Sequence, residues 1–406
     1  MKQAAPKGGL FCYVTMMEGF ELNVPVRQLV NVVTLAQAII FAAMLAPRAH
    51  RVSPAGWLLV SSLLILATVK ADQLYQGLGL LHQFPDHGFL LAPFQALMTP
   101  ALYLYVCAKT DRDFKLHKGH LWHASLFALF FLYLFVFYFR LAPEAKAAMI
   151  ESGFSGPLHR LVIPLIGDLV QLGYVIAALR RLQKFGVSLE NWFSRTEDRN
   201  LLWLKRLMTL WGAIFVLHAA WTAAAGIFGA APFARGVMDL LNFAHLAIAN
   251  ALAAIGFTDA ASPARTEQPR PAEKYAGSAL SADDRDTLFN KISKVMTDDA
   301  LYLSPDLTLR DLAERAGATP RELSEAINGA GGVTFFEFVN RARVEHARRL
   351  LIDQPGLQVL SIAHQSGFNS KTAFNESFRK ATGETPTGYR RRALAGRTVQ
   401  SVEKPA

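Results

Sequence analysis

The sequence predicts an all-α protein, with a seven-helix transmembrane bundle followed by a cytoplasmic tandem helix-turn-helix domain. Three observations predict this fold class. The chain is 52% hydrophobic and only 18% charged, with 28 Phe, which is typical of membrane segments joined to a polar domain. Apolar runs of roughly 20 residues, the length that a bilayer core requires, recur in the first two thirds of the chain. One short helix-turn-helix pattern then occurs twice between residues 307 and 389.

The apolar runs fill the N-terminal part of the chain. Residues 1–20 resemble a short lead that stays attached, because no small-residue cleavage site precedes Glu18. The run LFALFFLYLFVFYF has no polar face, which argues against seven buried helices of a soluble bundle. The seven predicted spans are 26–45, 56–76, 88–108, 119–139, 158–179, 207–229 and 233–256.

Basic residues alternate between the connections of these spans. The odd-numbered connections carry Arg48 and Arg51, then Lys109, Arg112, Lys115 and Lys118, then Arg180, Arg181, Lys184, Arg195, Arg199, Lys205 and Arg206. The even-numbered connections are poorer in Lys and Arg. The positive-inside rule therefore places the odd-numbered connections and the C-terminus in the cytoplasm, and the N-terminus outside. The net charge of +10 suits either nucleic acid or the anionic inner face of a membrane.

Several polar residues lie inside the predicted spans, where an ionisable side chain is costly and usually faces the bundle interior. Asp168, His218 and His245 lie at a similar depth in three consecutive spans, and Asp239 and Asn242 follow the same helical stripe as His245. These five residues either form a pocket for an unknown small ligand or join the helices by hydrogen bonds. Two further polar residues of the second span, Lys70 and Asp72, either share this pocket or, for the lysine, reach outward.

The sequence turns polar after the last span. We predict a membrane domain at 1–257, a Pro- and Ala-rich linker at 258–277, a DNA-binding domain at 278–394 and a disordered tail at 395–406. A helix should begin near Ser281, with an apolar stripe of Leu288, Ile292 and Val295. That stripe either packs on the first helix-turn-helix or forms the contact of a homodimer.

The repeated pattern has the spacing of a helix-turn-helix. In the first copy Ala313 precedes Gly317 by four residues, and the second copy repeats this with Ala363 and Gly367. The small residue lets two helices cross closely, and the Gly ends the first helix. Two apolar residues four positions apart should anchor each second helix. These anchors are Leu323 with Ile327 in the first copy and Phe374 with Phe378 in the second.

A helix-forming stretch, FFEFVNRARVEHARRLL, lies between the two copies, with Arg341, Arg343, Arg348 and Arg349 predicted on its polar faces. Here the chain resembles the DNA-binding domain of the AraC/XylS family of bacterial transcription regulators. The resemblance rests on the two Ala–Gly turns, on NRARVEHARRLL and on GFNSKTAFNESFRKATGETPTGYR. It departs from the family at Ile327 and Asn328, where an aromatic residue and a basic residue are common.

The predicted DNA-binding residues are those left facing outward on the two recognition helices and their caps. An Arg can read guanine, an Asn can read adenine, and helix N-termini bind phosphate. They are Thr319, Arg321, Glu322, Ser324, Glu325 and Asn328 in the first motif, and Ser370, Lys371, Thr372, Asn375, Glu376 and Arg379 in the second. Basic residues outnumber acidic residues between positions 341 and 392, so this part of the domain should supply most of the attraction for DNA phosphates.

These observations predict a multi-pass regulator of the bacterial inner membrane that binds double-stranded DNA and couples a membrane or extracytoplasmic signal to a promoter. No catalytic constellation, cofactor or metal site is expected. His117, His120 and His123 recur at three-residue intervals, but such histidines are more often solvated at an interface. The alternatives are a transporter or membrane enzyme with a regulatory DNA-binding appendage, and a regulator released by proteolysis within 258–277.

Overall fold

The computed structural model describes residues 11–16, 20–49, 54–111, 113–152, 158–196, 201–228, 234–261 and 280–402. The chain forms two compact units. The first comprises Met1–Leu182 and Leu202–Thr266, and the second comprises Gln183–Leu201 and Glu267–Ala406. The short segment at 183–201 therefore belongs to the C-terminal unit, although it lies between two predicted spans.

The first unit begins with a β-hairpin that the all-α prediction did not include. Strands β1 (Phe11–Met16) and β2 (Phe20–Pro25) are antiparallel, and Phe11 lies opposite Pro25. The alternation of apolar and polar residues in FELNVP is the period-two signal of a strand. The hairpin is short, and the described chain is otherwise helical.

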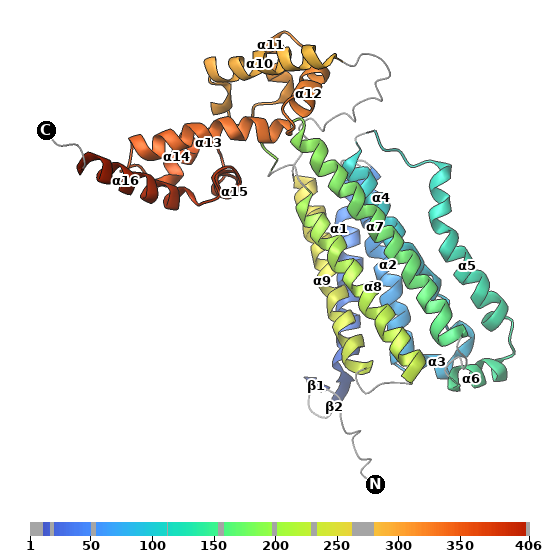
Figure 1. Ribbon diagram of the computed structural model, residues 1–406. Coiled ribbons are helices and arrows are strands. Elements are labelled where there is room, and N and C mark those ends of the chain that lie inside the picture. Colours follow the sequence, from blue (N-terminus) through green and yellow to red (C-terminus); the bar gives the residue numbers. More distant parts are fainter. Residues whose placement is uncertain are drawn as a thin grey trace. The chain divides into compact units, whose positions relative to one another are not determined.

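Helices form the rest of the first unit (Figure 1). They are α1 (Val26–Ala49), α2 (Pro54–Gly77), α3 (Leu80–Gln83), η2 (Pro85–His87), η3 (Ala92–Leu97), α4 (Met98–Thr110), η4 (Lys118–Ala124), α5 (Ser125–Leu134), η5 (Phe135–Phe139), α6 (Pro143–Glu151), η6 (Leu158–Val162), α7 (Ile163–Glu190), α8 (Leu202–Phe228) and α9 (Ala234–Ala261). Helix α1 packs on α2 and α9, and α2 packs on α4.

Six helical stretches in the described residues are long and apolar enough to cross a membrane, judged by length and composition. They are Val26–Ala49, Pro54–Gly77, Pro85–Thr110, Lys118–Phe139, Ile163–Glu190 and Leu202–Ala225. They coincide with the first six predicted spans. Helix α9 covers nearly all of the predicted seventh span but is not among the six, so that span stays a prediction.

A buried lysine joins three helices of this bundle. Lys70 on α2 is 0% exposed. Its Nζ donates to Asn242 Oδ1 at 2.7 Å, to Gln73 Oε1 at 2.8 Å and to Asn31 Oδ1 at 3.3 Å. Each acceptor offsets part of the cost of burying an ammonium group. Lys70 therefore turns inward and does not reach outward; it contacts Gln73 and Asn242, which line the cavity described below, but does not line that cavity itself.

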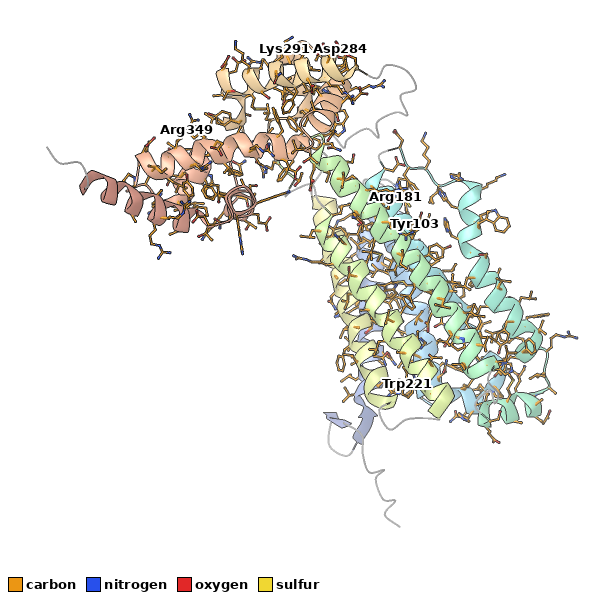
Figure 2. All side chains as sticks on the ribbon, viewed as in Figure 1. Tyr103, Arg181, Trp221, Asp284, Lys291 and Arg349 are labelled. Atoms are coloured by element: carbon orange, nitrogen blue, oxygen red, sulfur yellow. The ribbon has the colours of Figure 1, made fainter. Side chains whose placement is uncertain are left out.

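The second unit is helical in its described part. Its helices are α10 (Ala282–Asp298), η7 (Leu301–Leu303), α11 (Leu309–Ala316), α12 (Pro320–Gly329), α13 (Phe335–Asp353), α14 (Val359–Gln365), α15 (Lys371–Thr382) and α16 (Pro386–Val402). Helix α13 contributes to two hydrophobic cores. Its first turns, with Phe335 and Val339, enter the core of α10–α12, and Val344 and Leu351 enter the core of α14–α16. Figure 2 marks α10 by Asp284 and Lys291 and α13 by Arg349.

The apolar stripe of α10 packs within the same chain. Ile292 is 0% exposed, and Leu288 and Val295 pack against the first core. Ser281 caps the helix by accepting from the Asp284 backbone N–H, as the sequence predicts. The packing alternative is thus observed, and the homodimer stays a prediction.

The ends of the C-terminal domain differ in part from the predicted boundaries. Helix α16 continues through Ala395 to Val402, a stretch that contains no Pro to end it. The first part of the predicted disordered tail is therefore helical, which corrects the prediction for 395–402. Residues 403–406 lie outside the described residues. Of the predicted linker, 258–261 extend α9 and 262–277 lie outside the described residues.

Candidate functional site

The first helix-turn-helix is built by α11, a glycine turn and α12. Thr308 caps α11 in a capping box with Asp311, which closes the first turn. Gly317 ends the helix with φ at 64°, a left-handed conformation that Gly adopts without a steric penalty. Thr319 then caps α12 in a second capping box with Glu322. The Gly317 turn and the Thr319 cap were predicted from the sequence, whereas the Thr308 capping box was not.

The second helix-turn-helix repeats this arrangement with α14 and α15. Gly367 has φ at 85° and lies close to η7, since a Cβ there would come within 2.4 Å of the Tyr302 carbonyl oxygen. No larger residue fits this position without a shift of the backbone. Ser370 caps α15 by accepting from the Ala373 backbone N–H. The turn therefore both follows a helix and packs against η7, the short helix before the first motif.

The predicted anchors of both recognition helices are buried. Leu323 and Ile327 on α12 and Phe374 and Phe378 on α15 are all 0% exposed. Because apolar residues four positions apart lie on one helix face, their burial turns the opposite face outward. The prediction of which face is internal is confirmed.

None of the predicted DNA-binding residues is buried, but those of α12 already contact one another. Arg321 pairs with Glu325 at 2.9 Å, and Asn328 donates to Ser324 Oγ at 3.1 Å. The Thr319 backbone N–H lowers the pKa of the Glu322 carboxyl, which it binds in the capping box. Glu322 therefore has a structural role at this helix start. On the second motif Lys371, Thr372, Glu376 and Arg379 are exposed, and Ser370 and Asn375 are half-buried.

Helix α13 differs from its prediction at one residue. Arg341 and Arg349 are exposed and Arg348 is half-buried beside Tyr389, as expected for the polar faces of this helix. Arg343 is instead 2% exposed and is held among backbone carbonyls. The placement of Arg343 on the surface is thus wrong. Helical spacing counts an arginine as polar and carries no signal for its burial.

A second candidate site is a cavity of about 570 Å³ in the first unit, with mainly apolar walls. Four of the five predicted ligand residues line it: Asp168, His218, Asn242 and His245. The side chain of Asp239 lies outside the described residues. His218 Nδ1 lies 2.9 and 3.0 Å from the two carboxylate oxygens of Asp168, so these two residues form a pair.

The cavity also contains polar residues that the sequence analysis missed. Gln171 is 6% exposed and lines the cavity one helical turn beyond Asp168. Its Oε1 is buried and has no hydrogen-bond partner among the described residues, while its Nε2 donates to the Gln95 carbonyl. Gln73 and His159 line the cavity as well. The i, i+3 spacing from Asp168 is the signal that would have found Gln171.

Comparison with known proteins gives matches at the C-terminal part of the chain. A family described as a helix-turn-helix domain matches residues 312–392. An uncharacterized HTH-type transcriptional regulator of Staphylococcus aureus (strain COL) is 34% identical over 101 residues, which are 25% of this chain and 13% of that protein. The uncharacterized HTH-type transcriptional regulator YijO of Escherichia coli (strain K12) is 35% identical over 99 residues, 24% of this chain and 33% of that protein.

Among solved structures, the C-terminal domain of AraT, a response regulator from Geobacillus stearothermophilus, is 29% identical with a TM-score of 0.24. It covers 28% of this chain and 88% of that chain. The matches to the two curated regulators named above cover 13% and 33% of the length of those proteins. The chain carries an AraC-type helix-turn-helix domain at its C-terminus, and the relatives that match it are named as transcriptional regulators.

Proposed function

We propose that this protein is a membrane-bound transcription regulator that couples a membrane signal to the binding of a promoter. The observation that carries the proposal is a pair of capped helix-turn-helix motifs, each with a buried anchor pair and an outward recognition face, in a chain whose described residues contain six long apolar helical stretches. The partners that follow are double-stranded DNA, a lipid bilayer and a small ligand.

The arrangement of the two motifs supports recognition of a two-part DNA site. Helix α13 connects them and has 19 residues. At 1.5 Å per residue it is about 28 Å long, close to one turn of DNA at roughly 34 Å. Each recognition helix can then enter a successive major groove on one face of the duplex. The exposed basic side chains of α15 should supply more of the attraction for DNA phosphates than those of α12 do. On α12, Arg321 must leave Glu325 before it can reach a DNA base.

Removing one basic side chain from each recognition helix tests the proposed recognition of a two-part DNA site. Arg321→Ala and Lys371→Ala should each weaken specific binding by about 1–3 kcal/mol if each side chain contacts a base. The affected base pairs should differ between the variants and lie roughly ten base pairs apart, which footprinting and base-substitution scans measure. Lys294→Ala, an exposed lysine of α10, is the matched control. Wild-type binding by both folded variants would refute the assignment of the recognition helices.

Apolar surface supports the membrane assignment. Leu129 is 63% exposed, Leu169 is 66% exposed and Val216 is 58% exposed, each within one of the apolar helices. Large apolar side chains exposed along several helices are costly in water and favourable in a bilayer. The alternation of basic loops supports an external N-terminus and a cytoplasmic C-terminal domain.

Reporter fusions test the orientation. An enzyme that is active only outside the cytoplasm should work when fused after Pro85 or Ala147. The same enzyme should fail after Lys115 or Ser194, because the odd-numbered connections are expected to stay inside. Activity in the inverse pattern would place the helix-turn-helix domain on the wrong side of the membrane for DNA and would contradict the proposed function.

The cavity in the first unit supports the sensing part of the proposal. Its apolar walls suit a lipid-like or other apolar molecule, and the Asp168–His218 pair with the unpaired Gln171 Oε1 suits one hydrogen-bonding group on that molecule. Such a ligand acts on DNA binding only to the extent that it binds two conformations with different affinity.

A further inference from the structure

The segment 191–196, between α7 and α8, packs into the helix-turn-helix unit. Both flanking helices are candidate membrane spans, yet this segment belongs to the second compact unit. Phe193 is only 3% exposed. Trp192 packs against the first core, which contains Leu309 and Leu312. The segment therefore buries one aromatic ring and packs a second, half-buried ring within the helix-turn-helix unit.

Backbone hydrogen bonds fix the register of this contact. Phe193 pairs with Thr308 as an antiparallel bridge. The Ser194 N–H donates to the Leu307 carbonyl at 3.2 Å, and the Leu309 N–H donates to the Trp192 carbonyl at 3.0 Å. The segment thus forms a single antiparallel β-bridge with the chain that enters α11, held by two main-chain hydrogen bonds. Its position is defined to the residue.

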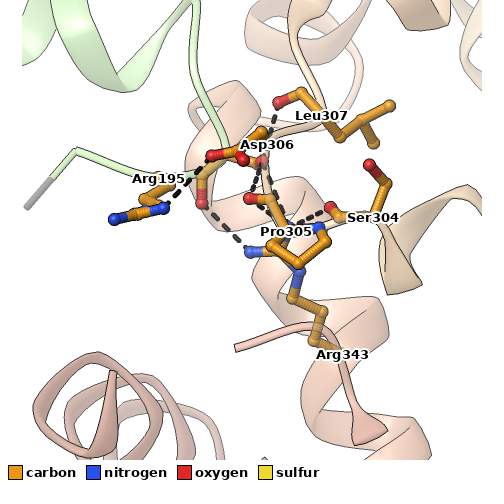
Figure 3. A network of polar contacts seen from close by, with 7 residues as sticks. Arg195, Ser304, Pro305, Asp306, Leu307 and Arg343 are labelled. Carbon is orange, nitrogen blue, oxygen red and sulfur yellow. Dashed lines mark hydrogen bonds and ion pairs between the residues drawn. The ribbon is translucent and has the colours of Figure 1, made fainter. Parts of the chain in front are cut away.

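Arg343 of α13 completes the contact from the other side (Figure 3). Its Nη1 donates to the Ser194 carbonyl at 3.1 Å, and its Nη2 donates to Ser194 Oγ at 3.2 Å. Its Nε donates to the Tyr302 carbonyl at 2.8 Å, and Nη2 also donates to the Ser304 carbonyl at 2.8 Å. A guanidinium stays charged, so its burial depends on these acceptors. Segment 191–196 provides two of them.

The same cluster touches the turn of the second motif. The Arg343 guanidinium lies 5.6 Å from the centroid of the Phe368 ring. A Cβ on Gly367 would lie 3.1 Å from Arg343 Nε and 2.4 Å from the Tyr302 carbonyl oxygen. The turn that precedes α15 therefore rests on the residues that segment 191–196 holds. One contact joins the entry of the first motif, helix α13 and the second turn.

We propose that the surface formed by residues 304–309 and Arg343 is a docking site for segment 191–196, and that this docking sets how the two recognition helices are held relative to each other. The inference rests on the proposed function and names its route of regulation. A change in α7 or α8 reaches the DNA-binding unit directly through this segment. The docked state holds both motifs in position for a two-part site, and undocking weakens only their joint binding.

Loss of the buried aromatic ring tests the docking. The full-length protein, in detergent or nanodiscs, is first used to select its preferred two-part site from random DNA. Scrambling one half of that site then gives a half-site DNA for comparison. Phe193→Ala should bind the two-part site about tenfold more weakly and the half-site within about twofold of wild type, because joint binding depends on preorganised spacing. Thr196→Ala, in the same segment, is the matched control and should bind both as wild type. Equal two-part binding by Phe193→Ala overturns the inference, whereas failure of wild type to select any DNA overturns the proposed function instead.

A reversible crosslink gives a second test that leaves the core unchanged. Arg195 and Asp306 form an ion pair at 3.3 Å between the segment and its docking site. Both side chains reach solvent, so Arg195→Cys with Asp306→Cys should fold and form a disulfide on oxidation. The oxidised protein should bind the two-part site at least about threefold more tightly than the same protein after reduction, with equal half-site affinity. Failure to crosslink, or identical two-part binding in both redox states, would show that the segment does not control recognition.

Discussion

Phe374→Ala should unfold the second helix-turn-helix and abolish binding to a two-part DNA site. Phe374 is 0% exposed, and its ring contacts Phe368 at 5.2 Å and Phe378 at 5.6 Å between centroids. Replacing a buried Phe by Ala typically costs about 3–5 kcal/mol, because apolar burial is lost and a cavity remains. That loss is a large fraction of the stability of a domain, which is about 5–15 kcal/mol. The loss of DNA affinity in Phe374→Ala should exceed the loss caused by replacing any single basic side chain on the recognition helices.

The measurement has to separate the two motifs. Phe374→Ala should expose 371–382 to limited proteolysis while the first core, built around Leu323 and Ile327, stays protected. Specific affinity for the half-site of the first motif should survive, and affinity for the full site should fall to that level. Asn375→Ala, the half-buried neighbour on the same helix, should leave protease protection unchanged. A Phe374→Ala protein with wild-type protection and wild-type full-site binding would contradict the role of this core.

The helix-turn-helix motifs were predictable because their signals are local. Gly317 and Gly367 take the left-handed conformations that end α11 and follow α14, and Thr319 and Ser370 cap the next helices. Each feature depends on neighbours within a few residues, so composition and spacing indicate it. The burial of the anchor Phe374 follows from the same helical periodicity.

Other features depend on residues far apart in the chain. Arg343 donates to Ser194 across 149 positions, and Lys70 donates to Asn242 across 172. Periodicity placed Arg343 on a polar helix face, and for Lys70 it left open whether the side chain points inward or outward. Only the tertiary fold supplies the carbonyls and amides that allow their burial. The pairing of Asp168 with His218 lies between these cases, because equal depth in neighbouring spans allowed hydrogen bonds between the helices but did not fix which residues pair.

Filling the cavity should abolish the response to its ligand. Gly167 on α7 lines the cavity, and a Cβ built there meets no atom within 4 Å. Gly167→Phe should therefore place an aromatic ring in the cavity without a backbone shift. Gly173 on the same helix also has no atom within 4 Å of a built Cβ and does not line the cavity, so Gly173→Phe is the matched control. Both variants add the same apolar bulk to α7.

Native mass spectrometry of the protein in mild detergent measures occupancy, and a promoter reporter measures output. Wild type and Gly173→Phe should retain a bound apolar molecule, whereas Gly167→Phe should lose it and hold the reporter at one level in every growth condition. Asp168→Asn with His218→Ala and His245→Ala should weaken retention without blocking the space, since these changes remove polar contacts and leave the apolar walls. DNA binding should be intact in both cases, because a ligand alters the output only through its different affinity for two conformations. If Gly167→Phe retains the apolar molecule and its promoter reporter responds normally, the cavity is not a ligand site. The Asp168–His218 pair would then only link two helices.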